Sequence, residues 1–228
     1  MTNDAASDSG LFATSDVASD RGLFVAFEGG EGAGKSTQAR ALAETLTAAG
    51  HEVVLTREPG GTPAAEAIRE VVLTPEYVGL DPRAEALLYA AARAEHVARL
   101  IRPALQRGAV VITDRYLDSS VAYQGIGRGL GPDVIGEINL WATQSLLPDL
   151  TVLLDVDARA GLQRIDTAPD RIEQEPEEFH SSVVQGFRAL AAGDPDRYLV
   201  LAAHEDREAI SARVLERVVA LIDSAAQA

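Results

Sequence analysis

Five short runs of mostly apolar residues recur along the chain, each bounded by polar or glycine-containing segments. Uninterrupted apolar runs of this length are typical of strands buried on both faces of a sheet. The runs that predict strands are residues 23–27, 52–56, 109–113, 150–154 and 198–201.

Between these runs, apolar residues recur at helical spacing, which predicts helices at 36–49, 62–73, 82–106, 133–145, 158–165, 176–191 and 207–225. Gly50 is the expected C-cap of the first helix, and Asp81 the expected N-cap of the third. Pro103 is a candidate for a kink in the third helix. Strands that alternate with helices predict an α/β fold with a parallel sheet covered by helices on both faces.

Composition places this sheet in one domain preceded by a tail. The chain has 228 residues, 46% of them hydrophobic, which is enough for a single core. Residues 1–20 are rich in Ser, Asp and Ala and predict a disordered tail, leaving residues 21–228 as the domain. The sequence has no apolar run near membrane-spanning length, no signal-peptide pattern at its start and no cysteine, so we expect a cytoplasmic protein.

Charge restricts the classes of partner. The formal net charge of −15 argues against general nucleic-acid binding, because most of the surface would repel a phosphate backbone. An anionic small molecule would therefore need a local cluster of cations. Lys35 is the only lysine among the 20 basic residues, and it lies in a motif.

That motif is GGEGAGKS, residues 29–36, which matches the phosphate-binding pattern G-x-x-x-x-G-K-[ST] between a predicted strand and a predicted helix. Its glycines allow backbone N–H groups to surround a phosphate, Lys35 can reach the β- and γ-phosphates, and Ser36 can offer a hydroxyl to Mg²⁺. The alternative is a glycine-rich turn without a ligand. The motif predicts binding of ATP with Mg²⁺ by Gly29, Gly30, Glu31, Gly32, Ala33, Gly34, Lys35, Ser36 and Thr37.

A second motif, TDRY, follows the third predicted strand. Asp114 can orient the magnesium shell together with Ser36, and Arg115 can reach a transferring phosphoryl group. The alternative interpretation is a surface ion pair at the end of a strand. The two motifs together favour a kinase, with Lys35, Asp114 and Arg115 in catalytic positions.

The stretches FEGGEGAGKST, TREPGGT, LLYAAARAEH, ITDRYLDSSVAYQG and RIEQE occur in the order and spacing seen in thymidylate kinases. The chain resembles that family from about Leu23 to the last predicted helix. The resemblance implies a P-loop nucleoside-monophosphate kinase fold with a five-stranded parallel sheet. It also implies the reaction ATP + dTMP → ADP + dTDP, and a homodimer.

The resemblance assigns acceptor-binding roles to several residues. Tyr89 and Arg93 lie four apart on a predicted helix and share a face; the family places the first against the thymine ring and the second at polar atoms of the base. Glu58 and Arg69 would contact the sugar and the 5′-phosphate, and Arg115 would also hold that phosphate. From pattern alone, Tyr89 could equally be a core aromatic and Arg69 a solvated helix residue.

Ser120, Tyr123 and Gln124 are expected on a loop after the TDRY motif. The amide of Gln124 offers a donor and an acceptor to the edge of a pyrimidine. In the family, the tyrosine at the position of Tyr123 crowds the sugar 2′ position and favours deoxyribose. A packing role in a rigid loop is the alternative for this tyrosine.

The third expected element is a lid at about residues 164–174. The phosphate-binding motif has no arginine, and Glu31 inside it is expected to point away from the triphosphate. The chain therefore resembles the bacterial type of the family, in which the lid supplies the catalytic cation. The candidates are Arg164 and Arg171, and the alternative for each is a solvated loop arginine.

Two other classes of P-loop protein are alternatives to a kinase. A non-catalytic nucleotide switch would not need the pocket around Tyr89, Tyr123 and Gln124. A partition-type ATPase would be expected to carry an early lysine in the phosphate-binding motif, where this chain has Gly30. Within the kinases, the alternative is an enzyme for another deoxynucleotide.

Overall fold

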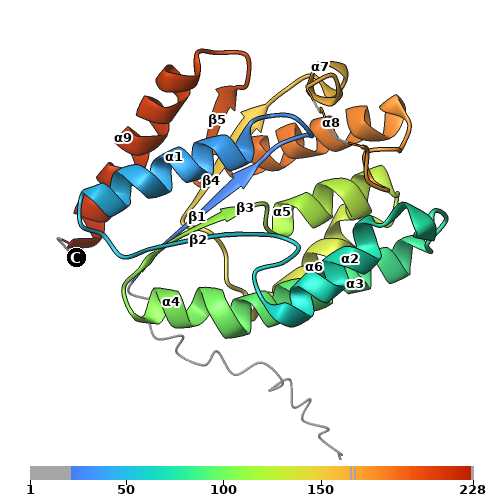
Figure 1. Cartoon of the computed structure of the whole chain (residues 1–228), viewed down its shortest axis with the longest axis horizontal. Coiled ribbons are helices and arrows are strands. Elements are labelled where there is room, and N and C mark those ends of the chain that lie inside the picture. The colour runs from blue at the N-terminus through green and yellow to red at the C-terminus, as the bar shows by residue number, and fades with distance from the viewer. Residues whose placement is uncertain (1–21, 165, 167, 227–228) are drawn as a thin grey trace, which may run out of the picture.

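The computed structural model describes residues 22–164, 166 and 168–226. The tail predicted at residues 1–20 lies outside the described residues. Five strands form one sheet: β1 (Leu23–Glu28), β2 (Val53–Arg57), β3 (Val110–Asp114), β4 (Leu150–Asp155) and β5 (Tyr198–Ala202). The strand order is β2-β3-β1-β4-β5, and every neighbouring pair is parallel (Figure 1). The predicted fold class is confirmed.

The order of the strands places the two motifs side by side. β1 is central and pairs with β3, so that Phe27 lies opposite Asp114 at the carboxyl ends of the two strands. The chain leaves β1 toward one edge of the sheet and later returns to add β4 on the other side. Ligands of open parallel sheets bind outside the carboxyl ends of the strands at such a reversal. The glycine-rich loop after β1 and the TDRY turn after β3 meet there.

Helices cover both faces of the sheet (Figure 1). α1 (Lys35–Ala48) and α9 (Arg207–Ala226) pack on one face, against Val25 and Phe27 of β1. Alternate residues of the same strand, Phe24 and Ala26, enter a second core with residues of the helices on the opposite face. The elements on this side and around the site are α2 (Pro63–Leu73), η1 (Pro75–Tyr77), α3 (Pro82–His96), η2 (Val97–Ile101), α4 (Arg102–Gln106), α5 (Leu117–Ser120), η3 (Val121–Gly127), α6 (Pro132–Thr143), α7 (Ala158–Leu162) and α8 (Glu177–Gly193).

The predicted helix at 82–106 is divided in the structure. It begins as expected, with the Asp81 carboxylate accepting from the N–H of Arg83 at 2.9 Å. A π-helical segment, η2, then separates α3 from α4, and Pro103 lies in the first turn of α4. Proline has no N–H to donate to the preceding turn, and the wider π turn accommodates it.

Two further expectations about local structure were wrong. The predicted loop that carries Ser120, Tyr123 and Gln124 is helical, formed by α5 and η3. Gly125 and Gly127 weaken the helical pattern there, but a Cβ on Gly127 would approach Phe179 to 2.7 Å, so close packing requires glycine. The helix predicted at 158–165 ends earlier, at Leu162.

Candidate active site

The glycine-rich loop between β1 and α1 wraps one cavity. A Cβ on Gly29 would clash with the carbonyl oxygen of Leu154, and one on Gly32 with that of Gly161, so both positions require glycine. The Nζ of Lys35 donates to the carbonyl oxygens of Gly29 at 3.0 Å and Gly30 at 2.7 Å. The cavity, called the phosphate cavity below, is lined by Glu31, Gly32, Ala33, Gly34, Lys35, Ser36, Thr37, Asp114, Arg115 and Arg164.

Ser36 and Asp114 lie together beside this cavity. The hydroxyl of Ser36 donates to the Asp114 carboxylate, which joins the first turn of α1 to the end of β3. Within residues 22–164, 166 and 168–226, no group of three or more His, Cys, Asp or Glu side chains could hold a metal. One carboxylate and one hydroxyl next to a phosphate cavity fit Mg²⁺, which keeps several waters and takes its other ligands from phosphates.

Arg115 occupies a left-handed backbone conformation, with φ of 71°. Its Nη1 donates to the carbonyl oxygen of Gly29 at 3.0 Å and to Ser119 Oγ at 3.2 Å, and its Nη2 donates to Glu31 Oε1 at 2.8 Å. The side chain lines both the phosphate cavity and a second cavity beside it. Arg115 therefore lies at the boundary between the two.

Glu31 is held at the same boundary. Its carboxylate accepts from Arg115 and, at 2.7 Å, from the hydroxyl of Tyr123. Burial alone would raise the pKa of this carboxyl, but Arg115 and Lys35 outweigh burial and lower the pKa to about 2. Glu31 also lines both cavities, with its charge paired with the Arg115 guanidinium.

The second cavity, called the acceptor cavity below, collects residues from distant segments. Its walls come from the turn after β2, from α2, α3, α5 and η3, and from the RIEQE stretch. Every residue expected to bind the acceptor lies on its lining: Glu58, Arg69, Tyr89, Arg93, Arg115, Ser120, Tyr123 and Gln124. The lining also includes residues with no role predicted from the sequence, namely Pro59, Leu73, Ser119, Asp170, Ile172 and Glu173.

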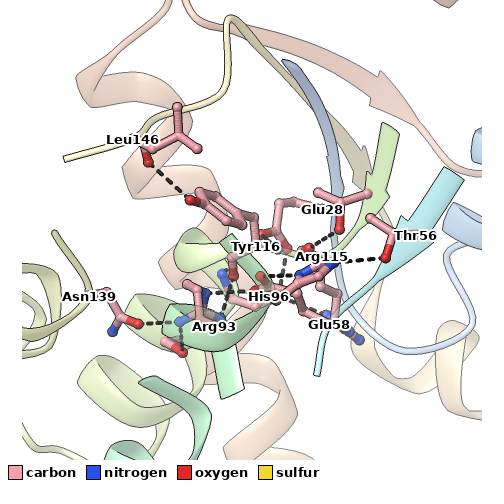
Figure 2. Close-up of polar contacts among 12 residues, drawn as sticks. Glu28, Thr56, Glu58, Arg93, His96, Arg115, Tyr116, Asn139 and Leu146 are labelled. Carbon is pink, nitrogen blue, oxygen red and sulfur yellow. Dashed lines mark hydrogen bonds and ion pairs between the residues drawn. The ribbon is translucent and has the colours of Figure 1, made fainter. Parts of the chain in front are cut away.

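A buried network fixes Arg93, whose side chain is 2% exposed. Figure 2 shows its guanidinium among Glu58, Tyr116 and Asn139. Nε donates to Glu58 Oε2 at 2.6 Å, Nη1 to Ser120 Oγ at 2.9 Å and to Asn139 Oδ1, and Nη2 to the Tyr116 carbonyl oxygen at 3.0 Å. Burial raises the pKa of Glu58, but Arg93 and His96 lower it below its usual value.

His96 was given no role from the sequence, and the structure places it in this network. Its Nδ1 lies 2.9 Å from Glu58 Oε1, and its Nε2 lies 2.8 Å from Thr56 Oγ1 (Figure 2). The ring is completely buried. His96 therefore contacts one carboxylate oxygen of Glu58 while Arg93 binds the other. This role depends on contacts between distant segments, so the sequence pattern does not predict it.

Two other predicted acceptor residues have fewer partners. Arg69 is only partly buried, and its Nη1 donates to the carbonyl oxygen of Pro59 at 3.0 Å, which keeps the guanidinium beside the turn after β2. Tyr89 lines the cavity wall, and burial raises the pKa of its hydroxyl. This phenol remains protonated at neutral pH.

The two lid arginines lie in different places. Arg164 Nη1 donates to the carbonyl oxygens of Ala203 at 3.2 Å and Gly32 at 3.4 Å, and the residue lines the phosphate cavity. Arg171 is 3% exposed and pairs with Glu85 at 2.7 Å, while its Nε donates to the carbonyl oxygen of Val72. The structure therefore brings Arg164, and not Arg171, to the phosphate cavity. Arg171 lies elsewhere because buried Glu85 needs a cationic partner.

Comparison with known proteins decides the family. The model of the thymidylate kinase family matches residues 27–214. The thymidylate kinase of Clavibacter sepedonicus is 54% identical over 207 residues, covering 90% of this chain and 98% of that protein. The chain belongs to the thymidylate kinase family.

Other thymidylate kinases extend this result. The thymidylate kinase of Deinococcus radiodurans is 50% identical over 192 residues, covering 83% of this chain and 93% of that protein. The crystal structure of thymidylate kinase from Ehrlichia chaffeensis superimposes with a TM-score of 0.72 at 34% identity, over 86% of this chain and 98% of that one. Membership of the thymidylate kinase family confirms the predicted fold and enzyme class, an ATP-dependent phosphotransferase. Among the described helices, none is long and apolar enough to cross a membrane.

Proposed function

We propose that the chain transfers the γ-phosphoryl group of ATP to dTMP, giving dTDP and ADP, with Mg²⁺ as cofactor. The observation that carries this proposal is the pair of adjoining cavities that share Arg115 and Glu31. Phosphoryl transfer needs a donor and an acceptor held in line across one boundary, with cationic groups at that boundary. A cavity lined by the glycine-rich loop and a neighbouring cavity lined by several arginines meet that need.

On the donor side, backbone N–H groups of the loop and the start of α1 would hold the phosphates. Lys35, already directed into the loop, would place its charge at the β- and γ-phosphates. Ser36 and Asp114 would hold Mg²⁺, which when bound neutralises charge on the donor phosphates. Arg164 would add a cation from the lid side of the same cavity.

On the acceptor side, the guanidiniums of Arg69 and Arg115 would clamp the 5′-phosphate of dTMP, since arginine binds phosphate with paired hydrogen bonds. Tyr89 would cover the thymine ring, and Arg93 and Gln124 would contact its polar edge. Tyr123 would crowd the 2′ position of the sugar and so favour deoxyribose. The rigid network around Arg93 supports a fixed geometry for the base.

The assignment is tested with a coupled assay of ADP release across dTMP, dUMP, UMP, AMP and GMP, with ATP and Mg²⁺. We expect dTMP to be used far faster than UMP or AMP, because base and sugar are both contacted. Another deoxynucleotide kinase is the alternative, and a higher rate with a different acceptor would select it. ATP binding without transfer to any acceptor would instead indicate a nucleotide switch.

We also propose a cytoplasmic homodimer formed through α3 and α6. Trp141 on α6 is 83% exposed, Val134 lies seven residues earlier on the same face, and Leu87 on neighbouring α3 is 57% exposed. Exposed large apolar side chains on two neighbouring helices favour a protein partner. A second copy fits the resemblance to the family, whereas the acidic charge argues against nucleic acid.

A further inference from the structure

Glu85 is a fully buried carboxylate at the start of α3, with no role predicted from the sequence. Its Oε1 accepts from Gln124 Nε2 at 3.0 Å and from Arg128 Nε at 3.1 Å. Its Oε2 accepts from Arg128 Nη2 at 3.1 Å and pairs with Arg171 Nη1 at 2.7 Å. Three side chains therefore converge on one carboxylate, Gln124 in η3, Arg128 at its end and Arg171 from a distant segment. One of them, Gln124, lines the acceptor cavity.

These partners keep Glu85 ionised at neutral pH. Burial raises the pKa of the carboxyl, but Arg128, Gln124 and Arg171 lower it below its usual value. An ionised carboxylate only accepts hydrogen bonds. The amide nitrogen of Gln124 must therefore face Glu85, because the flipped amide would place its oxygen against a carboxylate oxygen.

Fixing the amide in this way determines what Gln124 offers to a ligand. A primary amide has two N–H donors and one oxygen. With one N–H used on Glu85, the other N–H and Oε1 remain, and the structure gives Oε1 no hydrogen-bond partner within the described residues. Gln124 thus keeps one donor and one acceptor in a set order at the cavity wall.

Pyrimidines differ in the order of these groups. Thymine and uracil carry a carbonyl at position 4 and an N–H at position 3, so their edge offers an acceptor followed by a donor. Cytosine carries an amino group at position 4 and an unprotonated nitrogen at position 3, which is the reverse order. A Gln124 amide that could flip would pair with either edge, whereas a fixed amide pairs with only one.

We propose that Glu85 is a specificity-determining positioning residue that makes the site select the imide edge of thymine or uracil over cytosine, by fixing the Gln124 amide. This inference rests on the proposed function, because it takes the base to lie at Gln124. Arg128 and Arg171 hold Glu85 in place, and only Glu85 sets the orientation of the amide.

The test measures kcat/KM for dTMP and for dCMP with Glu85→Gln, and inhibition by dCMP where its turnover is too slow. The amide at position 85 could donate to or accept from Gln124, so both orientations become available. We expect the ratio of kcat/KM for dTMP over dCMP to fall at least about tenfold, as for loss of one paired base contact. Glu85→Asp, which retains an acceptor-only group, is expected to keep most of the selectivity.

Arg128→Gln provides the matched control, since it perturbs the same buried network and leaves the Glu85–Gln124 contact intact. Its ratio is expected to stay within about twofold of wild type. An unchanged ratio in folded Glu85→Gln, or an equal loss in Arg128→Gln, overturns the inference. If Glu85→Gln does not fold, the double variant Glu85→Gln/Arg128→Gln removes a positive charge together with the negative one, and the ratio is measured on it. Wild-type enzyme that does not use dTMP would instead refute the proposed function.

Discussion

The Nη2 of Arg115 lies 2.8 Å from the Oε1 of Glu31, which ties the turn after β3 to the glycine-rich loop. The two side chains are 17% and 19% exposed, and the guanidinium also lies 5.1 Å from the centre of the Tyr123 ring. A pair shielded in this way is screened by salt less than a surface pair. The consequence is that the cation at the boundary of the two cavities already has a fixed position, which reduces the reorganisation needed for transfer.

Lys35→Ala tests the donor site. The change removes the single charge that Nζ directs into the loop, so we expect kcat to fall at least about 100-fold while the fold is retained. Steady-state kinetics and circular dichroism measure the two effects. Arg40→Ala, an exposed cation on the same helix, is the control and should leave kcat nearly unchanged. Near-normal turnover in Lys35→Ala would rule out this role for the loop.

The two lid arginines should respond differently to removal. Arg164→Ala is expected to lower kcat by about 100-fold or more with little change in the Kd for dTMP, because a cation at the phosphate cavity acts on the transferring group. Single-turnover kinetics separate the chemical step from binding. Arg159→Ala on α7, an exposed arginine nearby, is the control. A wild-type chemical rate in Arg164→Ala would mean that the cation comes from elsewhere.

Arg171→Ala should act mainly on stability. Removing one partner of the buried Arg171–Glu85 pair leaves a carboxylate partly uncompensated, which we expect to lower the free energy of unfolding by about 3 kcal/mol. Arg128 still pairs with Glu85 and limits the loss. Urea denaturation measures the effect. An unchanged midpoint of unfolding together with a strongly reduced chemical rate would instead show that Arg171 acts in catalysis.

The environment of Glu28 should make the stability of the fold depend on pH. Its buried carboxyl accepts from the N–H groups of Tyr116 and Ser119 at 2.8 and 3.1 Å. Burial and the nearby charge of Asp118 raise its pKa from 4.5 to about 7. A raised pKa means that the fold favours the neutral form, so this stabilising contribution is present below pH 4.5 and is lost as the pH rises through about 7.

The variant Glu28→Gln keeps the neutral shape at every pH and should not suffer this loss. The measured quantity is the free energy of unfolding of the variant minus that of wild type. We expect this difference to increase by up to roughly 3 kcal/mol from acidic to alkaline buffer. Urea denaturation at a series of pH values compares the two proteins. A difference that does not change with pH would show that folding leaves the pKa of Glu28 unchanged.

The proposed dimer is tested at its centre. Trp141→Glu places a charge in the exposed apolar patch on α6 and should shift the mass in solution from twice 24.1 kDa to the monomer value. Light scattering coupled to size-exclusion chromatography measures the mass. Val219→Glu on α9, where the native side chain is 40% exposed, is the control and should leave the mass unchanged. A monomeric wild type would refute the homodimer directly.

Local patterns predicted the sheet and the phosphate loop, because apolar runs and the G-x-x-x-x-G-K-[ST] spacing depend on neighbouring residues. The helical structure of α5 and η3 could not be predicted locally, since Gly127 of η3 is explained only by its packing against the distant residues Phe179 and Val183. The roles of Glu85 and His96 could not be predicted for a similar reason. Their partners lie 39 and 38 residues away along the chain, in Gln124 and Glu58. Arg171 was placed near the donor because sequence position alone does not reveal a buried acid beside it.

The solitary lysine has a practical consequence. Lys35 provides the only side-chain primary amine of the protein, and it is 7% exposed beneath the glycine-rich loop. Acylating or aldehyde reagents that couple to lysine side chains therefore have one reaction site in the protein, and that site lies in the donor site. The extent of coupling would report the occupancy of the loop by nucleotide, without any engineered label.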